Sequence, residues 1–341
     1  MRVTVATENE SNLWNSFVEQ HEACVNYHRW PWKRVIEQAL GWRSHYLMAV
    51  DKEMVKGILP LFWQKSALFG TIFCSIPFFS QAGVVAEDEE VQDALLLEAI
   101  RIARDLKAEY LELRQRGIAL SKMNSKKNKA MLVCDVYPDM ARNMQRLTTK
   151  MRTNVRRALK TSLIAEFGGS ELLEDFYRIF SLRMRELGTP VYSQRFFEVI
   201  FENFPKEAFT CRVRNQGKTI SGAIVTGYRR IMEVNWSASD PSALALRPNI
   251  FLFWNLLNFV GRQGYSVFDF GRSSVGSGTY NFKLQWGAQP VQLYWNYWTP
   301  SGRSLDLSPD NPKFRAAIWL WKRMPLVFTQ LVGPFIARHL P

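Results

Sequence analysis

The stretch FDFGRSSVGSGTYNFKLQWGAQP (Phe268–Pro290) holds residue types that can do chemistry, spaced so that they would gather at the end of a strand. Asp269 stands inside an apolar strand, and Arg272 and Ser273 follow at its end. Polar groups in such a setting cost free energy unless they are paired or used. Three glycines, Gly271 before Arg272 and Gly276 and Gly278 in the loop that follows, would let backbone N–H groups approach an anion. The stretch therefore predicts a polar rim, with Arg272 and Ser273 as substrate-binding candidates.

The same loop closes on a lysine among aromatic residues. Acyl transfer develops negative charge on a carbonyl oxygen, and a fixed ammonium stabilises that charge best where water is excluded. Lys283 is the candidate for this ammonium, Phe282 for the wall that keeps water out, and Tyr280 for a hydrogen bond to substrate. The alternative is that Lys283 is a solvated charge and Phe282 a core anchor. Asp269 is the candidate for base chemistry, with a structural ion pair to Arg272 as its alternative.

The elements that must position this loop occur twice along the chain. The segments His45–Gln64 and Phe209–Tyr228 each contain two apolar runs around a short charged turn, as a β-hairpin requires. In each half a further strand, an apolar-periodic helix and a last strand follow. The repeated order predicts an α+β fold of two similar units. The predicted division is 1–138 for the first unit, 139–208 for a basic helical segment, 209–300 for the second unit with the catalytic loop, and 301–341 for an amphipathic tail.

This element order resembles the acetyltransferase-type (GNAT) fold used twice, and the motif from Asp269 to Trp286 resembles the Fem-type (FemAB) family. More closely, the chain is similar to the branch found with exosortase and PEP-CTERM exopolysaccharide systems. The segments HRWPWKRVIEQALG, KMRTNVRRALK and GTPVYSQRFFEVIFENFP also carry the resemblance, and Tyr192 in the last of them is a further substrate-binding candidate. The resemblance implies a transferase that moves an acyl, often aminoacyl, group onto an amine or hydroxyl of a cell-envelope precursor. It also implies that Phe282 and Lys283 act in catalysis or bind the acyl-donor end.

A basic segment, Ala141–Lys160, holds seven basic residues and no acidic one. Their spacing predicts two stripes of positive charge on neighbouring faces of one helix. Because like charges at this spacing destabilise a helix, we expect an anionic ligand, with Arg152, Arg156 and Arg157 facing it. The alternative is a solvated face. A smaller basic cluster, Lys122–Lys129, is predicted to be a mobile loop.

The sequence leaves the acyl donor open. An enzyme that uses acetyl-CoA would carry a glycine-rich loop that cradles the pyrophosphate, and neither half shows one. Arg247, next to the helix-starting Pro248, can still hold an anion near a helix N-terminus. Asn235 and Trp236, on the strand before it, are predicted to face a cleft and to bind substrate, with a turn cap as the alternative for Asn235. The expected donor is a co-substrate, either aminoacyl-tRNA or acyl-CoA, and no permanently bound cofactor is expected.

Composition narrows the class of partner. The net charge of +13 over 341 residues indicates an anionic partner, for which a phosphorylated small molecule, tRNA and an anionic bilayer surface are candidates. The four cysteines are scattered and the four histidines form no ligand pattern, so no metal is expected and the protein is predicted to be cytoplasmic. Neither a signal peptide nor an apolar run long enough to span a membrane is evident.

The tail from Phe314 is apolar, aromatic and basic, and Pro325 and Pro334 interrupt it. Two short amphipathic helices fit this pattern, lying either on the protein or on an anionic bilayer. Peripheral contact with the inner membrane is therefore part of the prediction.

Two other functions stay open beside the Fem-type transferase. One is an acyl-CoA-dependent N-acyltransferase acting on an amino sugar. The other is a non-catalytic RNA- or membrane-binding module, which the charge alone supports.

Overall fold

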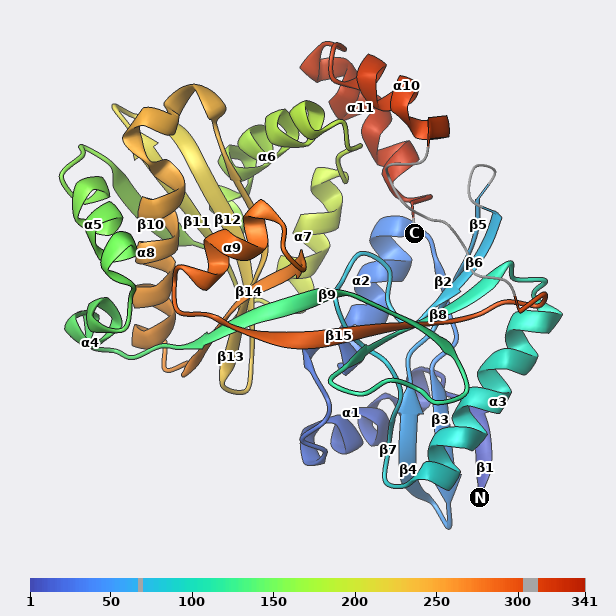
Figure 1. Cartoon of the computed structure of the whole chain (residues 1–341). Helices are drawn as coiled ribbons and strands as arrows, with labels where there is room; N and C mark the ends of the chain where they lie inside the picture. The colour runs from blue at the N-terminus through green and yellow to red at the C-terminus, as the bar shows by residue number, and fades with distance from the viewer. Residues whose placement is uncertain (67–69, 303–311, 341) are drawn as a thin grey trace. The chain divides into compact units, whose positions relative to one another are not determined.

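The computed structural model describes residues 1–66, 70–302 and 312–340, and the chain divides into two compact units (Figure 1). Unit 1 comprises Met1–Lys129, Gln292–Asp306 and Arg338–Pro341, and unit 2 comprises Ala130–Val291 and Leu307–Ala337. The basic segment 139–208, which the sequence sets apart, lies within unit 2. The predicted α+β fold class is confirmed.

Unit 1 consists of two small sheets and three helices. Its elements are β1 (Arg2–Val5), α1 (Ser11–Gln20), α2 (Pro31–Leu40), β2 (Arg43–Ser44), β3 (Leu47–Asp51), β4 (Met54–Leu59), β5 (Phe62–Ser66), β6 (Gly70–Cys74), β7 (Val85–Ala86), α3 (Glu89–Asp105) and β8 (Tyr110–Arg116). One sheet has the order β1-β3-β4-β7 and the other the order β8-β6-β5-β2. The apolar stripe of α3, with Leu95, Ala99 and Ala103, packs into the core beside β3 and β4. Strands β9 (Asn124–Asp135) and β15 (Gln289–Trp298) each contain a boundary between the units.

Unit 2 is built on one sheet in the order β10-β11-β12-β13-β14. Its elements are α4 (Met140–Gln145), α5 (Thr149–Ala158), β10 (Ile164–Gly168), α6 (Leu173–Leu187), α7 (Gln194–Asn203), β11 (Ala208–Asn215), β12 (Lys218–Tyr228), β13 (Ile231–Ser239), the 3-10 helix η4 (Pro241–Leu246), α8 (Pro248–Arg262), β14 (Val267–Ser274), α9 (Gly278–Leu284), α10 (Pro312–Trp321) and α11 (Leu326–Ala337). The strands are antiparallel from β10 to β13, and β14 then runs parallel to β13.

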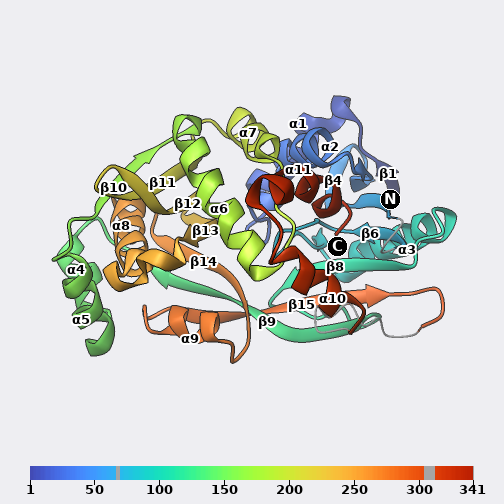
Figure 2. The same ribbon diagram turned by 90° about the horizontal axis from the view of Figure 1, so that it is seen from above.

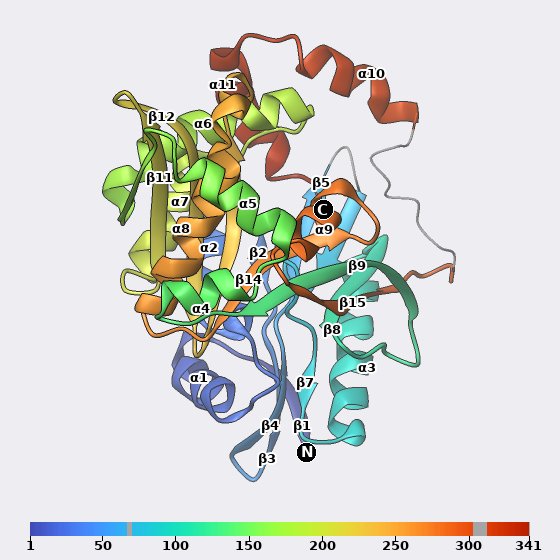
Figure 3. The ribbon, with the colours of Figure 1, turned by 60° about the vertical axis from the view of Figure 1, so that its left-hand side comes forward.

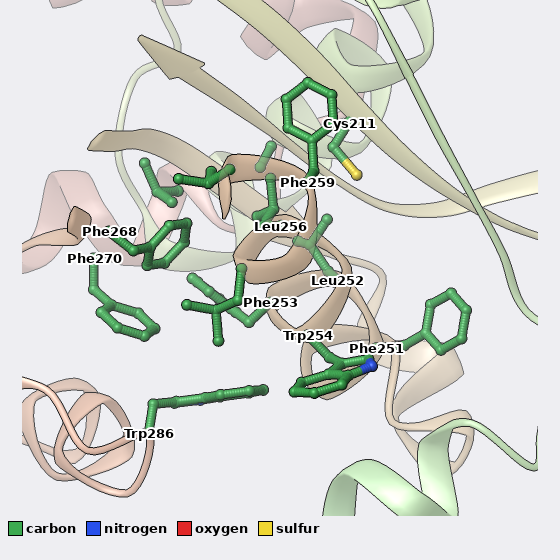
Figure 4. Packing of buried hydrophobic residues seen from close by; sticks show 14 of the residues in the cluster. Cys211, Phe251, Leu252, Phe253, Trp254, Leu256, Phe259, Phe268, Phe270 and Trp286 are labelled. Atoms are coloured by element: carbon green, nitrogen blue, oxygen red, sulfur yellow. The ribbon is translucent and has the colours of Figure 1, made fainter. Parts of the chain in front are cut away.

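Helices α8 and α6 cover opposite faces of this sheet (Figure 2). Alternate residues of β12 serve the two faces: Ala223 and Val225 belong to the core under α8, whereas Gly222 lies against Phe176 of α6. On the α8 side, Phe253, Phe270 and Trp286 pack side by side (Figure 4). Along the outer side of α8 lie α4 and α5 (Figure 3). Helices thus cover both faces of the sheet of unit 2, which is common where strands pair in parallel.

The predicted duplication is visible in the element order, but it is imperfect. Both predicted hairpins are present, as β3–β4 and β11–β12, and in each unit a helix precedes the strand that pairs in parallel. In each unit the parallel pairing spans three residues and ends on an acidic side chain, at Cys74↔Glu112 in unit 1 and at Glu233↔Asp269 in unit 2. The units differ because β3 and β4 belong to a sheet separate from β5 and β6.

The prediction of one continuous basic helix over Ala141–Lys160 is wrong. Helix α4 ends at Gln145, and α5 begins after Thr148, whose hydroxyl accepts a hydrogen bond from the Met151 N–H at 3.3 Å. The Thr148 hydroxyl also donates to the carbonyl of Gln285 at 3.2 Å. Such an N-cap starts a new helix in a new direction. The two charged stripes therefore do not continue across residues 146–148.

The cluster Lys122–Lys129 is not the predicted mobile loop, because β9 begins at Asn124. The ammonium of Lys129 lies 3.7 Å from the centre of the Trp295 ring, and that of Lys126 lies 5.0 Å from the Tyr297 ring. Cation–π contacts of this kind hold a lysine in place where its charge would otherwise be solvated. These lysines thus have structural contacts within unit 1.

The two short helices predicted for the tail are confirmed as α10 and α11, with Pro325 between them. Pro334 does not end α11, which continues three residues beyond it to Ala337, so only one backbone donor is lost near the helix end. Within the residues that the structure describes, no helix is both long enough and apolar enough to cross a membrane.

Candidate active site

The site is organised by an opening between the two parallel strands of unit 2. Strands β13 and β14 pair at Ile231↔Val267, Met232↔Phe268 and Glu233↔Asp269, and both continue beyond this point without further pairing to each other. The backbone of β14 turns at Gly271, where φ is +73° and a Cβ would lie 3.1 Å from the carbonyl oxygen of Val234. Only glycine meets both conditions without strain. The strands therefore separate just after the Glu233–Asp269 pair.

A β-bulge lies at the same level of the sheet. The register of β12 and β13 shifts between Ile224↔Trp236 and Val225↔Val234, which leaves Asn235 as the extra residue. Its Oδ1 accepts a hydrogen bond from the Thr226 hydroxyl at 2.9 Å. A bulge frees backbone polar groups from the ladder, and bulges are frequent next to active sites. The predicted position of Asn235 beside an opening in the sheet thus agrees with the strand geometry.

Lys283 reaches this opening from a helix, not from the loop that the sequence predicts. Helix α9 begins after Ser277, whose hydroxyl accepts the N–H of Tyr280 at 3.2 Å, and α9 packs against β14. The ammonium of Lys283 donates to the carbonyl oxygens of Gly271 at 2.9 Å and Arg272 at 3.0 Å. An ammonium has three N–H groups, and the third has no hydrogen-bond partner among the described residues. Two hydrogen bonds therefore fix the Lys283 ammonium in place, and its third N–H group is available to a ligand.

Burial and the neighbouring carboxylates shift the pKa of Lys283 in opposite directions. Burial lowers the pKa of Lys283 to about 8, while the carboxylates of Asp269 and Glu233 raise it and the guanidinium of Arg272 lowers it. Both carboxylates are buried, Asp269 at 1% and Glu233 at 8% exposure, and Asp269 accepts the N–H of Gly271 at 2.8 Å. At neutral pH the ammonium form still dominates, because the pKa lies above 7. The two carboxylates thus help to keep a partly desolvated charge on Lys283.

The pKa of Lys283 predicts how activity depends on pH. If the ammonium stabilises developing negative charge, kcat/KM falls as pH rises through about 8, because the proton is then lost. Lys283→Arg retains the charge over this range, since a guanidinium does not deprotonate there. We expect its residual activity to lack the alkaline fall. Profiles of kcat/KM against pH for both proteins make the comparison, and an identical fall in the variant would assign the titration to another group.

Three other predicted site residues differ in their surroundings. The ring of Phe282 lies 5.6 Å from the ring of Phe253 and 6.1 Å from that of Trp286, so it packs against the core, as the core-anchor alternative expects. Tyr280 also packs against this core. Ser273 is 6% exposed, and its hydroxyl has no hydrogen-bond partner within the described residues. An unpaired buried hydroxyl next to Arg272 is available to a ligand, which keeps Ser273 among the binding candidates.

On the α6 face of the sheet, two predicted binding residues come together. The rings of Tyr192 and Trp236 lie 6.5 Å apart, and Trp236 also contacts Phe196 and Phe197 of α7 at 5.5 and 5.1 Å. Trp236 follows the bulged residue directly, so this aromatic cluster begins one residue from the opening. Aromatic faces of this kind suit the apolar face of a sugar ring or an acyl chain.

Basic side chains gather near the N-terminus of α8. Arg247 is in the left-handed conformation, with φ +56°, and caps α8, and its guanidinium donates to the side chain of Asn154 of α5 at 3.0 Å. Arg156 and Arg157, one turn further along α5, are exposed and form no ion pair with any residue that the structure describes. Arg152 donates to the Thr149 hydroxyl at 3.2 Å. Asn154 thus ties α5, the helix that carries the three predicted arginines, to Arg247 at the start of α8.

The basic residues of α4 have other contacts. The guanidinium of Arg142 lies 3.7 Å from the ring centre of Tyr137, and that of Arg146 donates to the carbonyl of Asp135. Arg142 of α4 and Arg146, the residue that follows α4, thus both have contacts within the protein itself. Among the described residues, no three or more His, Cys, Asp and Glu side chains form a group that could hold a metal ion.

Sequence reasoning missed two residues of the site. Glu233 faces Asp269 only because β13 and β14 pair in parallel, and 36 residues separate the two carboxylates. Asn154 was not singled out because an amide within a basic helix carries no signal of its own. Its role depends on the packing of α5 against α8.

The comparisons with known proteins agree with this geometry. Residues 145–284, which include the opening and Lys283, match a family model described as an acetyltransferase (GNAT) domain. The predicted acyltransferase class and the predicted GNAT-like fold are confirmed, and a non-catalytic binding module is no longer supported. No curated protein matches the sequence.

Several solved structures share the fold. FemX superposes with a TM-score of 0.66 at 15% identity, covering 86% of this chain and 97% of FemX. L-PGS from Bacillus licheniformis gives a TM-score of 0.54 at 14% identity, covering 97% of this chain and 98% of that protein. A tandem GNAT protein from the clavulanic acid biosynthesis pathway gives 0.53 at 9% identity, covering 89% and 99%. At these identities the similarity shows a shared fold, in which the GNAT unit is used twice.

Proposed function

We propose that unit 2 transfers an acyl or aminoacyl group to an amine or hydroxyl of a cell-envelope precursor, as a Fem-type transferase does. The observation that carries the proposal is Lys283, whose ammonium is held by two backbone carbonyls at the opening between β13 and β14, inside a GNAT domain. The sequence resemblance to the exosortase and PEP-CTERM branch favours an exopolysaccharide precursor as the acceptor.

The transfer needs a nucleophile on the acceptor, an acyl carbonyl on the donor, and a group that takes up the proton that the nucleophile loses. The lone pair of the acceptor attacks the acyl carbonyl carbon, and the carbonyl oxygen becomes negative. The free N–H of Lys283 stabilises this oxygen, and the preorganised charge needs no reorientation during the reaction. The bond from the acyl carbon to the donor then breaks, and the proton of the acceptor leaves with the donor group. Asp269 and Glu233 maintain the charge of Lys283, and Asp269 fixes the turn at Gly271.

Donor and acceptor occupy different sides of the opening in this proposal. Arg247, the α5 arginines and the Arg272–Ser273 pair bind the anionic end of the donor, which is a phosphate of coenzyme A or of tRNA. Tyr192, Trp236 and Asn235 hold the acceptor on the α6 face. The alternative of an acyl-CoA-dependent N-acyltransferase acting on an amino sugar keeps support from the acetyltransferase description of the matching family model.

The α5 arginines should determine how strongly donor binding depends on salt. Replacing Arg152, Arg156 and Arg157 together by Gln is expected to weaken tRNA binding and to reduce the slope of log affinity against log salt by about 2, since each phosphate contact contributes roughly 0.7. Thermal stability should not fall, because Arg156 and Arg157 are exposed and lack ion pairs with described residues. Fluorescence anisotropy over a salt titration measures the slope.

A matched control removes the same charge elsewhere. Arg101, Arg183 and Arg195 each pair with a glutamate on their own helix. Replacing these three by Gln should leave the salt slope unchanged. If both triple variants reduce the slope equally, binding follows net charge and α5 is not the donor surface.

The donor is identified directly by a transfer assay. Purified protein is incubated with isotope-labelled acyl-CoA thioesters or with aminoacyl-tRNA, and with nucleotide- and lipid-linked glycan precursors as acceptors. Label that enters a precursor from either donor supports the proposal and identifies the donor. Label that enters only free amino sugars, from acyl-CoA alone, would favour the alternative.

A further inference from the structure

An ordinary surface helix turns its large apolar side chains toward the protein, but the C-terminal helix α11 turns its small side chains inward and its large apolar ones outward. Its small residues Thr329, Gly333 and Ala337 face the protein, and Thr329 and Ala337 are only 2% and 1% exposed. At Gly333 a Cβ would lie 3.0 Å from the backbone nitrogen of Val191, so α11 packs tightly through this side. The bulky apolar residues therefore point away from unit 2.

The outward face of α11 is apolar over its whole length. Val327, Leu331 and Phe335, at i, i+4 and i+8, are 76%, 68% and 60% exposed, and Phe328 beside them is 45% exposed. Exposed apolar residues normally occur singly, and a continuous stripe of this kind indicates a surface that becomes covered.

Helix α10 also exposes apolar residues, and it adds positive charge. Trp319 and Leu320 are 57% and 50% exposed, and the guanidinium of Arg323 stacks on the Trp319 ring at 3.8 Å. Arg315, Lys322 and Arg323 are exposed. These three side chains form no ion pair with any other residue that the structure describes. The chain from Asn311 to Pro341 contains no aspartate or glutamate.

We infer that α10 and α11 dock the protein on an anionic lipid bilayer, with the apolar face in the headgroup region and the basic side chains on lipid phosphates. A bulky apolar stripe with Trp and Phe, bordered by Lys and Arg, is the composition of a helix that lies in the membrane interface. Each basic residue near an anionic leaflet adds electrostatic attraction. The 12-residue α11 is about 18 Å long, too short to span the ~30 Å hydrocarbon core.

A second copy of the chain fits this surface less well. In a two-fold dimer the same patch meets itself, so the surface that carries Arg315, Lys322 and Arg323 would face an equally basic surface, without a carboxylate in the patch to separate the charges. An anionic bilayer instead offers lipid phosphates for the basic side chains and an apolar layer for the exposed apolar side chains of the two helices. Membrane docking is independent of the transfer reaction, and its test uses neither donor nor acceptor.

The test is flotation of the full-length protein with phosphatidylcholine vesicles that contain phosphatidylglycerol, compared with vesicles of phosphatidylcholine alone. We expect binding to fall at least about tenfold when the anionic lipid is absent. Replacing Val327, Leu331 and Phe335 by Ser should also weaken binding to the anionic vesicles at least about tenfold. Thermal unfolding should be unchanged, because these side chains are exposed.

The control variant replaces Met54, Leu97 and Ile118 by Ser, which are 56%, 68% and 68% exposed and lie far from the tail in the sequence. It should bind vesicles like the wild type. Wild-type protein that does not float, or a tail variant that floats equally well, would overturn the inference. Sedimentation without vesicles completes the test: a dimer that only the tail variant dissociates would identify a second copy as the cover and would equally overturn it.

Discussion

Lys283→Met is expected to lower kcat by a factor of about 10²–10³, or roughly 3–4 kcal/mol of transition-state stabilisation. The ammonium is fixed by the carbonyls of Gly271 and Arg272, and its remaining N–H has no partner among the described residues. Methionine keeps most of the aliphatic stem and removes the charge. The measurement is kcat and KM with the donor that the transfer assay identifies. We expect kcat to fall far more than the affinity for the acceptor, because the interaction forms only in the transition state.

Stability separates this effect from simple unfolding. The pKa of Lys283 is about 8 in the folded protein and near 10.4 in an unfolded chain, so the unfolded state binds more protons between these values. The free energy of unfolding therefore rises with pH over this window, and at neutral pH the buried charge is unfavourable. Removing this charge stabilises the folded state, and losing the hydrogen bonds to the carbonyls of Gly271 and Arg272 destabilises it. The two effects offset each other, so the melting temperature of Lys283→Met should stay close to that of the wild type. A variant that loses activity only in proportion to its loss of folded protein would show that Lys283 is structural.

Trp286→Ala is expected to lower the free energy of unfolding by about 3–5 kcal/mol, because it leaves a large cavity in a closely packed core. Trp286 is 0% exposed, and its ring packs beside those of Phe253 and Phe270 (Figure 4), at 6.2 and 6.3 Å between ring centres. The ring of Phe282 lies 6.1 Å from it. These rings join α8, β14 and α9, so the cavity also loosens the helix that carries Lys283. Urea denaturation of the two proteins measures the difference.

Trp286→Phe is the matched control. The indole N–H of Trp286 is buried, with no hydrogen-bond partner within the described chain, so phenylalanine removes an unsatisfied donor while it keeps an aromatic ring. We expect a loss clearly smaller than that of the alanine variant. Equal losses in both variants would mean that the indole makes a polar contact essential to the fold.

Local sequence signals predicted the elements of unit 2 well. The alternating apolar runs of Phe209–Tyr228 form a hairpin, and the apolar run after Pro248 forms a helix that is buried on nearly all sides. The Asp within FDFG lies in a buried strand, as expected. These features depend on neighbours within a few residues, which is the range over which hydrophobic periodicity and turn chemistry act.

The failures have two physical causes. Short helices such as α9 depend on a cap, and the glycines beside Ser277 read as a loop because they lower helix propensity. The candidate site depends on long-range pairing: Glu233 meets Asp269, and Tyr192 meets Trp236, only after the sheet and its helices have formed. Phe282 shows the limit of reading roles from adjacent residues, because its ring packs into the core while the Lys283 ammonium binds the carbonyls of β14.

The central claim is that a positive charge at position 283 drives the transfer, and chemical rescue tests it most directly. Lys283→Cys removes the ammonium, and alkylation with 2-bromoethylamine restores one on a side chain of nearly the same length. The four native cysteines, Cys24, Cys74, Cys134 and Cys211, are all buried, so the new thiol should react selectively, and mass spectrometry verifies the single modification. We predict that the unmodified variant loses about 10²–10³ in kcat and that aminoethylation restores most of it. A variant that keeps its turnover before alkylation, or that stays inactive after complete modification, would contradict the account.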